Sequence, residues 1–423
     1  MACGNIGRNA DSSQREVEVE PAAQVDSLPD FEAFRGEFPG TERAVYFDAA
    51  ARGLISRRTR AAIDGFLDDR LLRGGDKPAM FATLERARAR FAELINAAPG
   101  DVAITKNVSD GLNAAGMALP WQAGDEVLLC SSLEHPNNVY PWRHLARRHG
   151  VVLKDLPDRD GHLPVEAMAE AVTDRTRLVV AATSTFAPGY RCEFSALSAA
   201  CREHDAFLLV DAVQSAGVLH TDVEAMGVDG LAVSTQKGLL GVYGFGFLYC
   251  RRAWAERMEP AYLARFGVDM GDAHEASLGD DEYRYAPGAR RFDLGNYNYI
   301  GAYAADASIG QLLEAGTVAV ESHVCRLADR LAAGLREAGL PFDVSEPGPA
   351  LGSIVTVGTI GAGQHDSADD ERLVALDAFL RENGAVYSIR RGQLRFALHA
   401  YNNNDDVDQV IGWCTQWRRN NPA

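Results

Sequence analysis

The stretch from Leu208 to Arg251 constrains the fold most, because short apolar runs in it end in polar side chains. The run that ends at Val210 is too short for a helix and predicts a buried strand. Asp211 follows it directly, and Lys237 comes shortly after the next such run. Ligands of open α/β sheets bind at the carboxyl ends of the strands. We therefore expect Asp211 and Lys237 to face one ligand.

An acid and a lysine at neighbouring strand ends suit a cofactor with a protonatable nitrogen and a carbonyl group. Pyridoxal 5′-phosphate (PLP) has both. Lys237 would form a Schiff base with the carbonyl carbon. Asp211 would keep the pyridine nitrogen protonated, so that the ring remains an electron sink.

The same stretch contains VDAVQSAG, then STQK, then GFGFLY. It resembles the pattern VDGAQSxG, SxHK, GxGxLY of the class V aminotransferase family. These fold-type I PLP enzymes include cysteine desulfurases, isopenicillin N epimerase and kynureninase. Each piece alone is common, but the three in order are specific. The resemblance implies that Gln214, Ser234, Gln236 and Lys237 contact the cofactor. Gln236 replaces the family's histidine; it can hydrogen-bond the phosphate but carries no proton there.

Composition excludes several other classes of protein. The chain has 423 residues, 47% of them apolar, with a net charge of −17 and a pI near 5.1. This acidity argues against nucleic-acid binding and against an anionic-membrane anchor. No apolar run approaches the length of a membrane helix, and no secretory signal is apparent. Seven cysteines without paired spacing indicate thiols in a reducing cytoplasm. We expect no metal site.

Strand and helix patterns alternate from Val45 to Tyr249. Such alternation predicts an α/β fold with a mostly parallel sheet that helices cover on both faces. The remaining sequence predicts a smaller C-terminal α+β domain. We expect a disordered tail over residues 1–27, a large PLP-binding domain over 28–300 and a small domain over 301–423.

Two further motifs match the family. Val108 and Ser109 follow a predicted strand and open a helix, where N–H groups bind anions; the resemblance places the PLP phosphate there. By itself, Ser109 would be an ordinary N-cap. The segment EHPNNVYPW around His135 resembles EHPSNxxPW, in which the histidine stacks on the cofactor ring. A lone histidine is more often structural, but this context favours a functional role for His135.

Three more residues are assigned through the resemblance. Ala50 lies in a turn similar to YLDxAAxG, beside the substrate. Arg395 lies in LRFALHAYN, similar to RASLHxYN, and a guanidinium fork suits the α-carboxylate of an amino acid. Asn296 lies where the family reaches across a homodimer interface to the partner subunit's phosphate. Arg390 and Arg391 are interpreted as surface residues of an edge strand.

The reaction is less constrained than the cofactor, because one fold hosts many chemistries. No cysteine lies between Cys325 and Cys414, where cysteine desulfurases carry their nucleophile. With Lys237 as the base at Cα, we expect a C–S (β-elimination) lyase or an aminotransferase that acts on an amino acid. The alternatives are an epimerase, a desulfurase-like sulfurtransferase that uses a distant thiol, and a catalytically silent scaffold.

Overall fold

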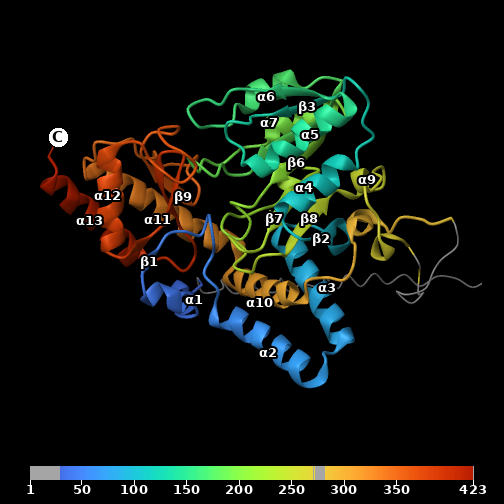
Figure 1. The fold of residues 1–423 in the computed structure, drawn as a ribbon, viewed down its shortest axis with the longest axis horizontal. Helices are drawn as coiled ribbons and strands as arrows, with labels where there is room; N and C mark the ends of the chain where they lie inside the picture. The colour runs from blue at the N-terminus through green and yellow to red at the C-terminus, as the bar shows by residue number, and fades with distance from the viewer. Residues whose placement is uncertain (1–28, 270, 272–281, 423) are drawn as a thin grey trace, which may run out of the picture.

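The computed structural model describes residues 29–269, 271 and 282–422; the predicted tail of residues 1–27 lies outside them. The described chain forms a large α/β body and a smaller α+β body side by side (Figure 1). None of the helices in these ranges has both the length and the hydropathy that crossing a membrane requires.

Within the described residues, the larger sheet has seven strands in the order β2-β8-β7-β6-β5-β3-β4. β8 runs antiparallel to both of its neighbours, whereas the other pairs are parallel. The mostly parallel sheet expected from the sequence is therefore confirmed. Its strands are β2 (Val102–Thr105), β3 (Glu126–Leu129), β4 (Val152–Asp155), β5 (Thr176–Ala182), β6 (Phe207–Asp211), β7 (Gly230–Ser234) and β8 (Gly246–Cys250).

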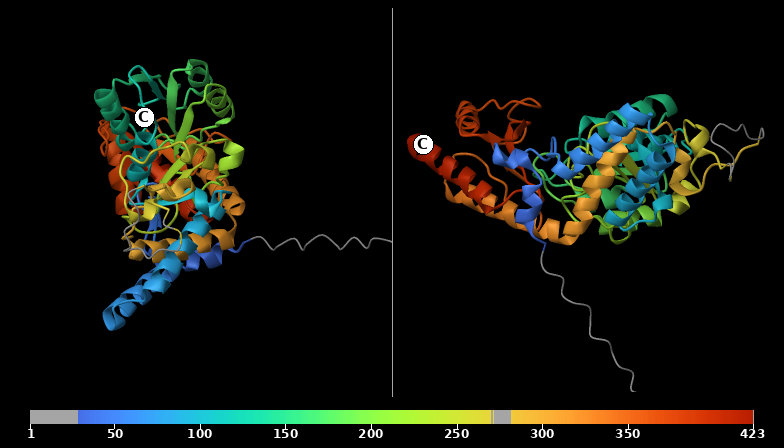
Figure 2. Two further views of the ribbon diagram at one scale, coloured as in Figure 1. Left: turned by 90° about the vertical axis from the view of Figure 1, so that its right-hand side faces the viewer. Right: turned by 90° about the horizontal axis from the view of Figure 1, so that it is seen from below.

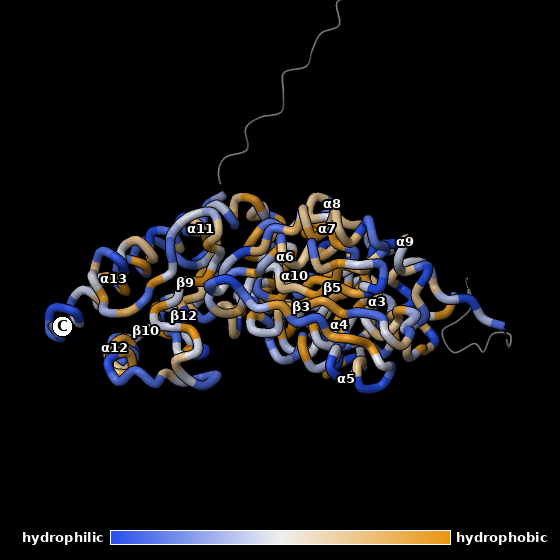
Figure 3. Tube along the Cα trace, turned by 90° about the horizontal axis from the view of Figure 1, so that it is seen from above, coloured by the Kyte–Doolittle hydropathy of each residue, from blue (hydrophilic) through white to orange (hydrophobic). Residues whose placement is uncertain are grey.

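Side chains of the central strands alternate between two apolar cores, as the pleat requires. In β6, Leu208 and Val210 belong to the larger core, whereas Phe207 and Leu209 belong to the smaller one. Figure 3 shows these strands as apolar segments inside the body. The smaller core is covered by α4 (Val108–Met117), α5 (Tyr140–His149) and α9 (Arg252–Ala255). The larger core is covered by α3 (Lys77–Leu94), α6 (Val165–Ala171), α7 (Ser195–Glu203), α8 (Val223–Met226) and α10 (Tyr299–Ala315).

The smaller body packs three helices with an antiparallel sheet of order β11-β12-β9. Its elements are β9 (Ile354–Val357), β11 (Ser388–Arg390), β12 (Gln393–Ala397), α11 (Thr317–Glu337), α12 (Glu371–Glu382) and α13 (Asn404–Asn420). Helix α12 begins after Asp370, not after Ser367. Asp370 caps the helix by accepting hydrogen bonds from two backbone N–H groups, while Ser367 Oγ accepts from Gln364 N in the preceding turn.

The N-terminal segment joins the smaller body rather than ending in the large one. Strand β1 (Val45–Tyr46) pairs in parallel with β10 (Ala385–Val386). Upstream, α1 (Phe31–Gly36) carries Arg35, which forms a bidentate ion pair with Asp406 at 2.7 and 2.9 Å. The N-terminal segment is therefore tied to the start of α13. The boundary at residue 300 stays a prediction.

Helix α2 (Arg57–Arg73) projects from the body as one arm of a helical hairpin with α3 (Figure 2). Leu71 and Leu72 near its tip are 80% and 72% exposed, and Leu67 is 45% exposed. Exposed leucines clustered on one projecting helix are typical of a contact surface.

Candidate active site

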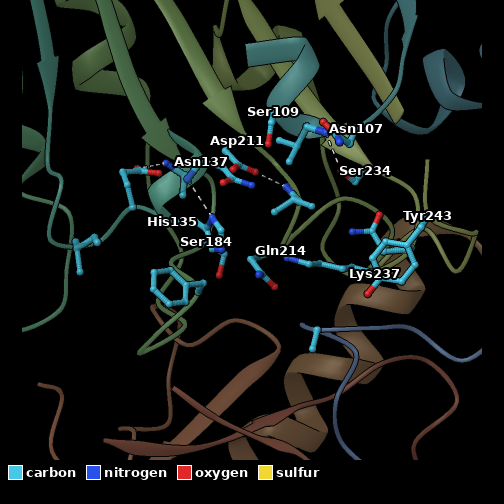
Figure 4. A pocket seen from close by; sticks show the side chains of 18 of the residues that line it. Asn107, Ser109, His135, Asn137, Ser184, Asp211, Gln214, Ser234, Lys237 and Tyr243 are labelled. Atoms are coloured by element: carbon cyan, nitrogen blue, oxygen red, sulfur yellow. Dashed lines mark hydrogen bonds between the residues drawn. The ribbon is translucent and has the colours of Figure 1, made fainter. Parts of the chain in front are cut away.

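A cavity of 320 Å³ opens at the carboxyl ends of the parallel strands. Asp211 ends β6, Ser234 ends β7 and Ala182 ends β5, and all three line this cavity. Figure 4 shows the side chains that converge on it. The sheet thus brings together most of the predicted site residues, namely Val108, Ser109, His135, Asp211, Gln214, Ser234, Gln236 and Lys237.

Asp211 and Lys237 form the charged centre of the cavity. Burial raises the pKa of Asp211 to about 6, although Val213 N donates to its Oδ1 at 2.9 Å. Burial also lowers the pKa of Lys237 to about 8, against the opposing effect of the Asp211 carboxylate. Lys237 is only partly shielded from solvent because the cavity opens onto it, yet protein surrounds it closely enough to disfavour its charge. Near neutral pH, a fraction of the Lys237 side chains is therefore unprotonated and can accept a proton.

The lysine loop is clamped by close backbone contacts. Gly53 N donates to Gln236 O at 2.9 Å, and a Cβ on Gly53 would lie 2.4 Å from Lys237 O. Only glycine fits there, which explains the glycine in the turn after β1. His399 Nε2 donates to Gly238 O at 2.8 Å while Ala400 N donates to its Nδ1. The loop is therefore held by the N-terminal segment on one side and by the C-terminal body on the other.

The N-terminus of α4 forms the anion-binding end of the cavity. The helix begins after Asn107, whose side chain accepts a hydrogen bond from Asp110 N at 2.9 Å. Val108 N donates to Ser234 Oγ at 2.7 Å, and Ser109 lies beside them (Figure 4). Hydroxyls and N–H groups at a helix N-terminus suit a phosphate. The sequence analysis did not include Asn107, although an Asn before a predicted helix is a cap signal.

His135 lies in the cavity wall with a neutral ring. Burial, together with the positive charge of Lys237 and other nearby cations, lowers its pKa to about 4. Its Nδ1 accepts from Asn137 N at 3.2 Å, so the proton is on Nε2. The neighbouring Glu134 is buried and accepts from Ala182 N at 2.7 Å; burial and the Asp211 charge raise its pKa to about 8.

Arg395 and Ala50 lie beside the cavity rather than in its lining. Arg395 is fully buried; its Nε donates to Ser388 Oγ at 3.0 Å and its Nη1 to Phe186 O at 2.9 Å. Phe186 itself does line the cavity. Ala50 is buried and its carbonyl accepts from Gln214 Nε2 at 3.3 Å, whereas the next residue, Ala51, faces the cavity. Ser184 also lines the cavity, as does Tyr243, which the sequence did not single out.

Asn296 lies in a separate cavity of 260 Å³ that shares Gly244 with the first. Its loop is anchored by Asp293, which is wholly buried with Arg88 in an ion pair of 2.7 Å. Ile104 N donates to Asp293 Oδ1 at 2.8 Å, and the Tyr297 hydroxyl donates to Oδ2 at 3.0 Å. The structure therefore does not bring Asn296 into the cavity of its own chain.

The donor set of the larger cavity fits PLP. Gln214 Oε1 is buried without a hydrogen-bond partner among the described residues, and an amide left so suits a polar ligand. An amine, a buried carboxylate and a helix N-terminus converge around it, matching the aldehyde, ring nitrogen and phosphate of the cofactor. Over the described ranges, no group of three His, Cys, Asp or Glu side chains is placed to hold a metal ion.

Comparisons with known proteins identify the family of the chain. The family model "Aminotransferase class-V" matches residues 45–410. A protein named uncharacterized aminotransferase YcbU, from Bacillus subtilis, is 27% identical and aligns over 92% of this chain and 97% of its own length. A probable cysteine desulfurase of Pseudomonas aeruginosa is 30% identical over 91% and 97%. A cystine C–S lyase, solved with its product cysteine persulfide, has a TM-score of 0.77 at 22% identity and covers 89% and 99%.

Proposed function

Because the chain belongs to the class V aminotransferase family, we propose that this cavity is where it breaks the Cα–H bond of an amino acid, as a C–S lyase or an aminotransferase. The chain is a PLP-dependent enzyme of that family. The observation that carries the proposal is Lys237, an amine with a pKa of about 8 that faces the cavity beside a buried carboxylate. When bound, PLP withdraws electrons from Cα and so acidifies the Cα–H bond.

The protein's own groups divide the remaining tasks. Val108, Ser109 and Ser234 would hold the phosphate at the start of α4, with Gln236 beside them. Asp211 would hold a proton on the ring nitrogen, because a buried carboxylate is stabilised by an adjacent cation. Gln214 would contact the ring. The neutral His135 would cover one ring face and fix its plane.

Lys237 has two roles in this scheme. It anchors the cofactor, and once a substrate amine has replaced it, its neutral amine takes the proton from Cα. Arg395 would bind the α-carboxylate of the substrate. Burial and the nearby Arg390 disfavour the charged guanidinium and lower its pKa to about 9. A carboxylate beside Arg395 would stabilise this buried charge. Ala50 would act only indirectly, through the carbonyl that positions Gln214.

Persulfide transfer is disfavoured by the placement of the thiols. None of the described cysteines lines the cavity. Burial raises the pKa of each of them, to about 11 for Cys325 and about 12 for Cys201 and Cys414. A nucleophilic thiol requires the opposite shift. Elimination or transamination therefore accounts for the site better than desulfuration does.

Incubation of the holoenzyme with a panel of amino acids tests the proposal. A lyase releases ammonia and a keto acid in equal amounts, with sulfide when the substrate is cysteine. An aminotransferase turns over only with a keto-acid acceptor. Lys237→Ala should abolish both reactions and the visible absorbance band of the bound cofactor. Wild-type protein that shows no band after PLP is added would refute the proposal.

We further propose a cytoplasmic homodimer in which Asn296 reaches the partner subunit's phosphate site. The exposed leucines of α2 and the position of Asn296 outside its own cavity support this. Lys237→Ala and Asn296→Asp chains, inactive separately, should regain activity when mixed, since one hybrid site has both residues intact. Light scattering at the mass of one chain would contradict the dimer. The described cysteines form no disulfide, which favours a reducing compartment.

A further inference from the structure

Arg390 lies on the same face of its strand as the residue that holds Arg395. In β11, Ser388 and Arg390 are two residues apart, so their side chains point to the same side. Ser388 pairs with Arg395 across the hairpin, and its hydroxyl accepts from Arg395 Nε at 3.0 Å. Arg390 lies on a strand at the edge of its sheet, as expected, and is half-buried there. The two guanidinium groups therefore neighbour each other at the substrate end of the site.

Neither arginine has an acidic partner within the described ranges. Arg390 Nη1 donates to Ile389 O at 2.6 Å, and Arg395 contacts a hydroxyl and a carbonyl. The positive charge of Arg390 lowers the pKa of both Arg395 and His135. The negative charge of Asp48 raises the pKa of Arg395. However, the Asp48 carboxylate also forms an ion pair of 3.6 Å with Arg52, so its charge is shared. Asp366, the other nearby acid, acts on His365 and forms no ion pair with either arginine in the described residues, so neither guanidinium charge is directly neutralised.

A wall of rings closes this end of the site. The ring centroid of His365, in the loop before α12, lies 6.3 Å from that of His135 and 6.4 Å from that of Phe186. His135 and Phe186 are 5.8 Å apart. His365 also experiences the charge of Arg390 and of Arg395. A substrate side chain that leaves Cα towards the small body would meet these rings and Arg390.

The cofactor phosphate does not account for this second cation. The groups that suit the phosphate, Asn107, Ser109 and Ser234, lie at the opposite end of the cavity from the small-body strands (Figure 4). The α-carboxylate of an amino acid occupies one arginine fork, which the proposed function gives to Arg395. Arg390 then remains for an anion on the substrate side chain.

We propose that the substrate is an acidic α-amino acid, whose side-chain anion is bound by Arg390 beside His365. This inference rests on the proposed function, because it assumes that Arg395 binds the α-carboxylate. An arginine–carboxylate contact shielded from water is a charge-assisted bond and is among the stronger polar interactions in proteins. A substrate with a neutral side chain would leave the charge of Arg390, which acts on His135 and Lys237 in the cavity, without a counter-charge.

Binding of unreactive carboxylic acids to the holoenzyme tests the inference without turnover. Glutarate and butyrate differ by one carboxylate, and their affinities can be read from the shift of the cofactor's visible band. Glutarate should bind about 10- to 100-fold more tightly, the ratio expected for one charge-assisted contact. Arg390→Gln should remove this preference and leave butyrate binding unchanged, whereas Arg390→Lys should retain part of it. Arg395→Gln should weaken both.

Arg391→Gln is the matched control, because the Arg391 guanidinium donates to Ser132 O instead. It should bind both acids as the wild type does, with the same thermal midpoint. Equal affinities for the two acids in the wild type, or an equal loss of both in Arg390→Gln, would overturn the inference. If the visible band forms but glutarate is not preferred, only the inference fails. If no band forms with PLP, the proposed function fails first.

Discussion

Replacement of Arg88 by Met isolates the contribution of a buried ion pair that anchors the Asn296 loop. Both Arg88 and Asp293 have fully buried side chains, and their N–O distance is 2.7 Å. Without Arg88, the Asp293 carboxylate keeps the hydrogen bonds from Ile104 N and the Tyr297 hydroxyl and a longer ion pair of 3.5 Å with the half-buried Arg290. Removing one partner of such a pair costs about 3–5 kcal/mol, because the other charge stays buried. Glu85 does not compensate, since it is itself an acid.

This cost converts to a measurable thermal shift. Unfolding entropy is about 2.1 cal/mol/K per residue, or roughly 0.9 kcal/mol/K over 423 residues. The thermal midpoint of Arg88→Met should therefore fall by about 3–6 °C in scanning calorimetry. Arg88→Met/Asp293→Asn should regain at least half of the loss, because no unpaired charge remains. A fall of less than about 1 °C in the single variant, or additive losses in the double variant, would refute the reasoning.

Three further predictions concern the cofactor. The pKa of Asp211 is about 6 in the protein alone, and a cationic ring nitrogen should lower it. PLP affinity, measured by equilibrium dialysis, should then fall by up to about tenfold per pH unit below pH 6. The Asp211→Asn variant should not show this dependence on pH. Gly53→Ala places a Cβ 2.4 Å from Lys237 O and should reduce PLP affinity at least about tenfold. In Gly36→Ala the added Cβ meets no atom within 4 Å, so this control variant should bind PLP as the wild type does. Equal losses of PLP affinity in the two variants would contradict the proposed clamping of the lysine loop. Removal of PLP should lower the thermal midpoint of the wild type, since a ligand at 100 times its Kd stabilises the folded state by about 2.7 kcal/mol. Lys237→Ala should lose PLP on dialysis, because the cofactor is then not covalently held.

The large body was predictable from sequence because its signals are local. Each strand of the parallel sheet is a short apolar run, and Asp211 marks its own strand end directly. The motif spacing then placed Asp211, Lys237 and Ser109 together, and the cavity contains all three. For the large body, the sequence therefore indicated the order of the elements and the residues at their ends.

The small body was less predictable because its contacts are not local. The short run 386–389 belongs to two sheets: Val386 pairs with Tyr46 in one, and Ser388 pairs with Arg395 in another. No local pattern reveals a partner that lies hundreds of residues away.

The pairing of β1 with β10 also dictates an order of events during synthesis. Val45 leaves the ribosome early, but its partner Ala385 is made about 340 residues later, a delay of roughly 17–70 s at 5–20 residues per second. Until then, Val45 and Phe47, both buried in the finished protein, have no sheet to join. The nascent chain therefore carries an unsatisfied apolar strand throughout translation, which is the kind of segment that holding chaperones bind. Closure of the C-terminal body, and with it completion of the lysine clamp by His399, can occur only after synthesis is nearly finished.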